Sequence, residues 1–378
     1  MSSRKRTDLS AETVDTLTGA DQQPSRSSAA SVAPPFAAME EPLQVAAGDE
    51  YAQLRRLVKQ AGLLEKQPAY YARKFVLTLT MLAAGLAFLA MVDNIWLQLV
   101  DAVFLAAVFA QMAFLGHDAG HRQIFRSARR NDIVGLGIAF LLGMVRTWWV
   151  DKHNRHHSFP NELGKDPDVD IPVLAFDEKD ALRKKGIFRF IVKYQAYLFI
   201  VMLSLEGFIG LRLAGIQYML QKKLKYPVAE PLIMIAHFVA FLGLVFYLLS
   251  PWHAALFLVV HQTLFGLYMG AVFAPNHKGM PMIDGEATLD YLRRQVITAR
   301  NINPNPVTDF CYGGLNYQIE HHLFPDMSRN RLGEAREIVR AYCLDRGISY
   351  YETNPLRAGR EILSFLHRNG APLRSKAS

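Results

Sequence analysis

Two long segments of the chain contain neither lysine nor arginine, and this feature constrains the fold more than any other. They run for 47 residues between Lys74 and Arg122 and for 52 residues between Lys225 and Lys278, although 42 of the 378 residues are basic. Each segment consists mainly of two apolar runs, and the four runs cover residues 75–92, 96–116, 232–249 and 252–274. Because an α-helix crosses a bilayer with about 20 apolar residues, we predict an all-α integral membrane protein with four transmembrane helices arranged as two hairpins.

The positions of the basic residues predict the orientation of these helices. All 42 lie before residue 75, in residues 122–225, or from residue 278 onward. Cytoplasmic segments of membrane proteins are enriched in Lys and Arg, so we expect both termini and all three segments in the cytoplasm. The net charge of +8 then marks orientation, with membrane lipid as the partner, and nucleic-acid binding is disfavoured. The two cysteines, Cys311 and Cys343, are too few for a disulfide framework or a four-Cys zinc site.

Composition divides the chain into three parts. Residues 1–50 are rich in Ser, Ala, Thr and Pro and are expected to be a disordered tail. Residues 51–355 are expected to form the membrane domain, and residues 356–378 a C-terminal tail. Within the domain, the apolar stretch 133–145 is too short for a span, and charged residues interrupt the stretch 187–220. We expect both to form interfacial helices, next to a cytoplasmic helical cap.

Seven of the twelve histidines occur in three clusters outside the apolar runs. The clusters are His117 and His121, then His153, His156 and His157, then His321 and His322 preceded by Gln318. Spacings of three and four residues place imidazoles on one face of a helix, and neutral imidazole is the commonest metal ligand. Seven rings exceed the four ligands of one zinc ion, so we predict that the cap holds two metal ions. An eighth ring, His277, follows the fourth run and returns to the same side of the membrane.

Polar residues beside these clusters are candidates for a supporting role. Asp118, Asp151 and Glu320 border the clusters and would either orient imidazole N–H groups or form ordinary surface salt bridges. Asn276, next to His277, is a further candidate, as a ligand or in support of one.

The residues by themselves leave the metal open. Zinc binds nitrogen sites more tightly than ferrous iron does, so affinity does not select iron. Hydrolytic zinc chemistry would normally recruit a carboxylate at an HExxH-like spacing, and no such motif occurs in the sequence. A histidine-rich pair of ions at the membrane surface, without a Ser or Cys nucleophile constellation, favours oxygen activation on a hydrophobic substrate.

The sequence resembles the membrane-bound fatty acid desaturases, a family with three histidine boxes and four transmembrane helices in two hairpins. The matching segments are GHDAGH (116–121), WWVDKHNRHHSFPN (148–161) with KDPDVD (165–170), and GGLNYQIEHHLFP (313–325). In having a glutamine at the start of the third box, the sequence resembles the front-end subgroup. Members of this subgroup insert a double bond between an existing one and the carboxyl end. This signature leaves the bond position open.

The resemblance implies a diiron centre that uses O2 to insert a cis double bond into an acyl-CoA or acyl-lipid chain. The implied iron ligands are His117, His121, His153, His156, His157, His321 and His322, with His277 as an additional one. Gln318 would act directly or through a water molecule. Many front-end relatives carry a fused cytochrome b5 domain with an HPGG motif, and HPGG does not occur in these residues. We therefore expect a separate electron donor, such as a ferredoxin, a flavoprotein reductase or a cytochrome.

Two further features bear on the substrate. Trp148 and Trp149 precede the second cluster and would either line a substrate channel or belong to the aromatic belt of the membrane interface. The basic groups at residues 183–185 and 222–225 would hold a CoA or phospholipid phosphate, and attraction to anionic headgroups explains them equally well.

Two alternatives stay open at this point. A related diiron hydroxylase or ketolase would add oxygen to the chain instead of removing two hydrogens. A non-catalytic membrane haem or zinc protein would use His237 and His261, which lie within the apolar runs. We expect these two histidines to be packed side chains instead.

Overall fold

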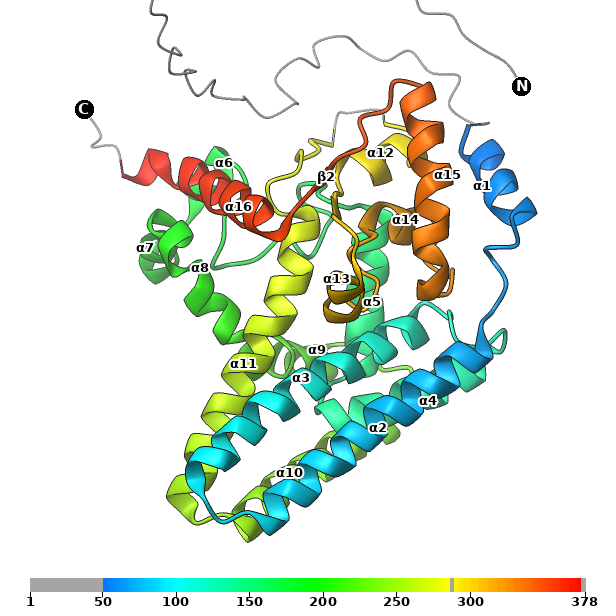
Figure 1. Ribbon diagram of the computed structural model, residues 1–378. Coiled ribbons are helices and arrows are strands. Elements are labelled where there is room, and N and C mark those ends of the chain that lie inside the picture. Colours follow the sequence, from blue (N-terminus) through cyan, green and yellow to red (C-terminus); the bar gives the residue numbers. More distant parts are fainter. Residues whose placement is uncertain (1–49, 286–288, 375–378) are drawn as a thin grey trace, which may run out of the picture. The chain divides into compact units, whose positions relative to one another are not determined.

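Four helices in the described part of the chain are long and apolar enough to cross a membrane, as the sequence predicts. This computed structural model describes residues 50–285 and 289–374, so the predicted tail at residues 1–50 lies outside the described residues except for Glu50. The four helices are α2 (Pro68–Met91), α3 (Ile95–Gly120), α10 (Ala229–Leu248) and α11 (Pro251–His277). The α2–α3 and α10–α11 turns lie at the same end of these helices (Figure 1). The predicted all-α fold with two hairpins is confirmed.

The helices extend beyond the apolar runs at their histidine-bearing ends. Proline at the first position begins both α2 and α11, where its missing N–H group costs nothing. Helix α3 continues through the first histidine cluster to Gly120, and α11 continues through Pro275 to His277. Histidines from two spans therefore leave the apolar layer on rigid helical backbone.

Helices α3 and α11 pack against each other in the interior, whereas α2 and α10 lie outside them. The outer helices expose apolar side chains such as Val76 and Val239, which are 66% and 69% exposed. Exposed apolar surface of this extent suits contact with lipid.

Each stretch predicted to be interfacial belongs to a pair of short helices that meet at a sharp angle. Helix α4 (Ala128–Leu142) meets α5 (Arg146–Ser158) at 110°, and α7 (Gly186–Lys193) meets α8 (Gln195–Ser204) at 106°. Gly143 makes the first bend possible because it adopts a left-handed backbone with φ of 66°. By length and composition alone, the described residues contain four spans, or up to six if each bent pair counts as one.

The connection between the bent pairs and α10 contains further short elements. These are α6 (Glu178–Arg183), the π-helical turn η1 (Glu206–Gly210) and α9 (Leu213–Gln221). Turn η1 packs against α11 and against α8. Its position next to α11 matters for the cavity described below.

A second core lies among the shorter helices, which gather above the four long ones in Figure 1. They are α1 (Glu50–Gln60), α12 (Tyr291–Ile297), α13 (Pro306–Cys311), α14 (Gln318–Leu323), the 3-10 turn η2 (Arg329–Arg331) and α15 (Leu332–Asp345). Apolar residues of α1, α12, α14 and α15, including Leu54, Val296 and Val339, form this core. Strands β1 (Asn301–Ile302) and β2 (Glu352–Thr353) pair in parallel. This core holds α14, and with it the third histidine cluster.

The folded body continues past the boundary that we predicted at residue 355. Residues beyond it form α16 (Pro355–Asn369) and the 3-10 turn η3 (Ala371–Leu373), and α16 packs against α8 and α11. Ala358, Ile362 and Leu366 are buried on one face of α16. Their four-residue spacing is a helical signal, and these residues form a packed helix instead of the predicted tail.

Candidate metal centre

Four helices bring all eight predicted imidazoles to one place. His117 lies in the last turn of α3 with His121 just beyond it, and the second cluster lies on α5. His277 ends α11, and the third cluster lies on α14. Seven of the eight rings form two groups, and within each group the ligand nitrogen atoms all lie within 4.8 Å of one another. Group 1 is His117, His121, His153 and His321, and group 2 is His156, His277 and His322.

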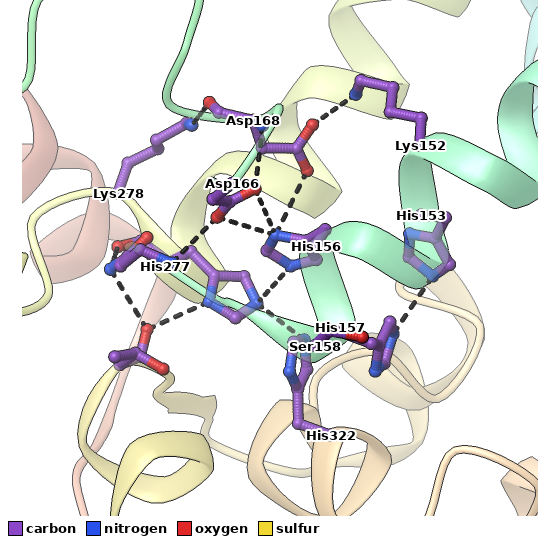
Figure 2. Close-up of polar contacts among 12 residues, drawn as sticks. Lys152, His153, His156, His157, Ser158, Asp166, Asp168, His277, Lys278 and His322 are labelled. Atoms are coloured by element: carbon purple, nitrogen blue, oxygen red, sulfur yellow. Dashed lines mark hydrogen bonds and ion pairs between the residues drawn. The ribbon is translucent and has the colours of Figure 1, made fainter. Parts of the chain in front are cut away.

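Group 2 is held by hydrogen bonds from outside. His156 Nδ1 lies 3.0 Å from both carboxylate oxygens of Asp166, and His277 Nδ1 lies 3.0 Å from the Thr298 carbonyl oxygen. His322 Nδ1 lies 2.9 Å from Gln295 Oε1. Figure 2 shows His156 between the two aspartates on one side and His277 on the other. Each ring therefore has its outer nitrogen engaged and its inner nitrogen pointing toward the group.

The acceptors fix the protonation of these three rings. A carbonyl oxygen and a carboxylate only accept, so Nδ1 of His277 and of His156 carries the proton. Gln295 donates through its Nε2 to the His157 carbonyl oxygen, which leaves its Oε1 to accept from His322. In the neutral form of each ring, Nε2 then carries the lone pair. His277 Nε2 lies 2.9 Å from the amide Nε2 of Gln318, 3.3 Å from His156 Nε2 and 3.0 Å from His322 Nε2. Converging lone pairs repel one another unless a cation lies between them, so this donor set fits a metal ion.

Group 1 has less support from hydrogen bonds. His117 Nδ1 lies 3.3 Å from Asp118 Oδ1, and its Nε2 lies 3.2 Å from that of His321. Among the described residues, His121 Nε2 and His321 Nδ1 are buried without a hydrogen-bond partner. The ring of Trp149 stacks on that of His153 with centroids 4.6 Å apart. Aromatic packing, more than hydrogen bonding, orients this group, and its unpartnered nitrogens also fit a metal ion.

His157 lies between the two groups. Its Nε2 is 3.2 Å from that of His153, and its ring stacks on that of His322 with centroids 4.1 Å apart. Its Nδ1 is buried without a hydrogen-bond partner among the described residues. The ring is thus in direct contact with a member of each group.

Burial lowers the pKa of most of these imidazoles well below the usual value, and neighbouring imidazoles lower the pKa further. This holds for His121, His153, His157, His321 and His322. Burial alone would also lower the pKa of His156, but the carboxylates of Asp166 and Asp168 raise it. Neutral imidazole is the form that binds metal, and a carboxylate behind the ring makes it a stronger donor.

The other predicted polar residues fall into two sets. Gln318 Nε2 lies 2.9 Å from His277 Nε2, and Asn276 Nδ2 lies 3.1 Å from Gln318 Oε1, so both extend group 2. Asp118 contacts His117 and also accepts from Arg329 Nε at 2.5 Å.

Asp151 and Glu320 make other contacts. Asp151 is exposed on α5, where it interacts with Tyr218. Glu320 is fully buried and accepts from Tyr350 and Asn301, and burial raises its pKa to about 7. Neither carboxylate contacts an imidazole among the described residues.

The residues that support group 2 are not predicted by the histidine clusters. Asp166 lies in the KDPDVD segment, so a signal for it existed, but no role was assigned to it. Asn161 donates its backbone N–H to Asp166 at 2.8 Å and its side-chain amide to the His277 carbonyl oxygen at 3.1 Å. Gln295 and Thr298 belong to no motif, and only the folded chain brings them to the imidazoles.

A cavity of about 250 Å³ borders both groups. His117 and His153 of group 1 and His156 and His277 of group 2 line it. Its apolar wall includes Phe199, Met202, Leu203 and Phe273, and both Trp148 and Trp149 line it as well. Lys152, Asp168, Glu206 and Lys278 contribute a charged part of the wall. An apolar cavity with a few polar groups is typical of a ligand site.

The comparison with known families agrees with this geometry. The fatty acid desaturase family model matches residues 94–354, which include all eight histidines. The chain belongs to the fatty acid desaturase family. Together with the four candidate spans, this membership supports a multi-pass membrane protein.

Several curated desaturases are similar to this family member. The acyl-lipid (9-3)-desaturase of Physcomitrium patens is 30% identical over 329 residues, which are 84% of this chain and 62% of that protein. The Delta(6)-fatty-acid desaturase fat-3 of Caenorhabditis elegans is 29% identical over 317 residues, 80% of this chain and 70% of that protein. The Delta(8)-fatty-acid desaturase of Euglena gracilis is 30% identical over 341 residues, 85% of this chain and 77% of that protein. The chain thus spans less than two thirds of the moss protein.

Proposed function

We propose that this chain is a fatty acyl desaturase that inserts a cis double bond into an acyl chain at the expense of O2, with an iron ion bound by each histidine group. The observation that carries the proposal is the convergence of three imidazole Nε2 atoms in group 2, at the wall of an apolar cavity. The relatives named above are desaturases by name, which supports the same activity here.

The donor set supports two iron ions. Group 1 offers four imidazoles, group 2 offers three, and His157 lies between them. Gln318 lies beside group 2 with its amide nitrogen toward His277. An amide nitrogen does not bind a metal, so Gln318 would act through a water molecule, or directly once its amide oxygen is turned toward the ion. Imidazole suits iron as well as zinc and copper, so the metal itself follows from the desaturase chemistry proposed.

The chain's own residues position the substrate. Two bound iron ions would supply the activation of O2 and the removal of hydrogen from two neighbouring methylenes. Overall, one O2 takes up two hydrogens from the acyl chain and two electrons with two protons from a donor, and two waters leave. Methylenes of one chain are chemically alike, so only their placement in the cavity selects between them. Phe273, Trp149 and Leu203 line the cavity beside the histidines and would hold the chain there.

We further propose the orientation and the partners. The histidine groups and both termini face the cytoplasm, since the basic residues lie on that side of the two hairpins. A separate ferredoxin, flavoprotein reductase or cytochrome delivers electrons, and the acyl chain arrives as an acyl-lipid or acyl-CoA. Reconstitution of the purified protein with each donor in turn tests this part.

Expression in a host with a simple lipid profile and a competent electron donor tests the activity. The expected result is a fatty acid lighter by two hydrogens, with its double bond located by mass spectrometry. The double variant His156→Ala/His157→Ala should abolish the product, while His367→Ala should not, because His367 is exposed and remote from the groups.

Three other results would contradict the proposal. A product that has gained one oxygen would indicate the hydroxylase, and one that has gained one oxygen and lost two hydrogens would indicate the ketolase. A haem absorption band, or bound zinc alone, would indicate the non-catalytic protein built on His237 and His261. An unchanged lipid profile with an active donor would reject the activity.

A further inference from the structure

The charged part of the cavity wall contains two lysines and two carboxylates. They come from four places: Lys152 from α5, Asp168 from the loop after it, Glu206 from η1, and Lys278 from the residue after α11. Lys152 and Asp168 form an ion pair, which Figure 2 shows beside His156. The other two charged groups, Lys278 and Glu206, form no ion pair among the described residues.

Lys278 has no carboxylate partner within ion-pair distance among the described residues. Its ammonium donates to the main-chain carbonyl oxygen of Asp168 at 2.5 Å and lies 4.3 Å from the ring centroid of Phe176. An ammonium group has three donors, so the carbonyl and the Phe176 ring do not use all of them. The side chain is half-buried, and a partly desolvated cation is stabilised when an acceptor occupies this space.

Glu206 is the matching unpaired carboxylate. Within the described part of the chain, its side chain forms neither a hydrogen bond nor an ion pair, although Lys152, Asp168 and Lys278 interact with it electrostatically. The carboxylate folds over Gly210 at the other end of η1, where an added Cβ would lie 2.2 Å from it. The glycine therefore provides the space in which this carboxylate sits. A partly buried donor and a partly buried acceptor line one cavity and are not paired with each other.

We propose that Lys278 and Glu206 hold the polar end of the acyl substrate: Lys278 donates to the carbonyl oxygen of its ester or thioester, and Glu206 pairs with the positive charge of a zwitterionic carrier. This inference rests on the proposed function. Lipid esters and CoA thioesters share the carbonyl. The four charges cancel, however, and this wall lacks the excess of cations that several CoA phosphates would need. We therefore assign the carrier as a membrane glycerolipid.

The position of Lys278 gives this anchor a consequence for the product. Lys278 directly follows His277 of group 2, and Asp168 lies 3.6 Å from His156. A carbonyl held by Lys278 would therefore lie only a few methylenes away from the histidine groups. The anchor would fix which methylenes reach the metal site, and would place the double bond near the carboxyl end.

Quenching of tryptophan fluorescence by brominated acyl chains tests the anchor without requiring activity. The chain has four tryptophans, of which Trp148 and Trp149 line the cavity, whereas Trp96 and Trp252 are 74% and 78% exposed near the hairpin tips. In a Trp96→Phe/Trp252→Phe background, purified protein in detergent is titrated with dibromostearoyl phosphatidylcholine and, separately, with dibromostearoyl-CoA.

Saturable quenching by the phosphatidylcholine is expected, and K278M should weaken it by about tenfold. E206Q should weaken it less, and K278R should restore most of it. The matched control is K66M, because Lys66 is also a half-buried lysine that donates to a main-chain carbonyl oxygen, that of Asp326, outside the cavity. In the expression assay, K278M should also spread the product over several double-bond positions.

The outcomes separate the anchor from the activity. Equal quenching in K278M and the parent protein, or no saturable quenching by either probe, would overturn the anchor. Tighter binding of the CoA probe would overturn the assigned carrier. Saturable, Lys278-dependent binding without any desaturated product would leave the anchor standing and reject the proposed function.

Discussion

The two histidine groups are similar in composition but differ in what holds them. In group 2, the outer nitrogens of all three rings are engaged, by Asp166, the Thr298 carbonyl and Gln295. In group 1, the outer partner is Asp118 on His117, and two other rings have buried nitrogens without a partner among the described residues. Group 2 is therefore preorganised by hydrogen bonds, and group 1 relies on packing around Trp149. Outer partners orient metal ligands and raise their basicity, so we expect group 2 to bind its ion more tightly.

The largest expected effect comes from removing a ligand of the better-supported group. His277→Ala deletes a ring that contacts both His156 and His322. The variant should retain about half of the bound iron and lose more activity than the roughly 10–100-fold that follows from loss of an outer partner. Elemental analysis of purified protein and product analysis by mass spectrometry check this.

The control for this loss is His367→Ala, which changes an exposed ring of α16. It should keep both the iron content and the activity of the parent protein. If His277→Ala also kept them, His277 would not be a ligand, and the assignment of group 2 would fail.

The next effect concerns Asp118, the outer partner that group 1 has among the described residues, which also stabilises the fold. Asp118 Oδ2 accepts from the buried guanidinium of Arg329, while Oδ1 faces His117. Asp118→Asn would leave the Arg329 charge uncompensated, which costs about 3 kcal/mol of folding free energy. Thermal denaturation in detergent should show this loss in both the metal-free and the metal-loaded protein. A variant as stable as the parent would show that Arg329 has another compensating partner.

A smaller and more specific effect is expected at group 2. Asp166 is fully buried, and its oxygens accept from His156 and from the backbone N–H groups of Asn161 and Asp168. Asp166→Asn keeps one accepting oxygen but removes the negative charge behind His156, so iron affinity should fall about 10–100-fold. Stability of the metal-free protein should change less than in Asp118→Asn. Competition with a chelator measures the affinity, and an unchanged value would remove the distinction between the two groups.

The sequence predicted the candidate ligand histidines better than the residues that hydrogen-bond to these histidines. His117 with His121, and His321 with His322, are recognisable because ligands on one helix must repeat every three or four residues. Their convergence follows from two hairpins that return to the same side. Asp166 reaches His156 only because the chain turns at Asn161, whose φ of 56° is unusual for a residue other than glycine. No local pattern predicts that turn.

Gln295 and Thr298 show more clearly that a contact made only in the folded chain has no local sequence pattern. Both lie in or just after the short helix α12. Their contacts to His322 on α14 and to His277 at the end of α11 depend on how this segment packs against those two helices. Such packing is a tertiary property, whereas single-sequence patterns report local structure. Helix α16 is the opposite case, since its buried four-residue spacing was visible in the sequence.

The smallest effect is expected at Glu320. Its substitution tests whether this residue stabilises only the surrounding fold or also acts on the metal site. Glu320 lies next to His321 of group 1 and near His322 of group 2 in sequence, but its oxygens accept from Tyr350 at 2.7 Å and Asn301 at 2.8 Å. Asn301 in turn accepts from the backbone N–H of Ile319, so this network ties α14 to β1. Glu320→Gln keeps the shape and one accepting oxygen, so it should cost about 1 kcal/mol of stability and leave iron affinity unchanged. A tenfold or greater loss of iron affinity would mean that the carboxylate acts on the histidines after all, and that group 1 has support that its hydrogen bonds do not reveal.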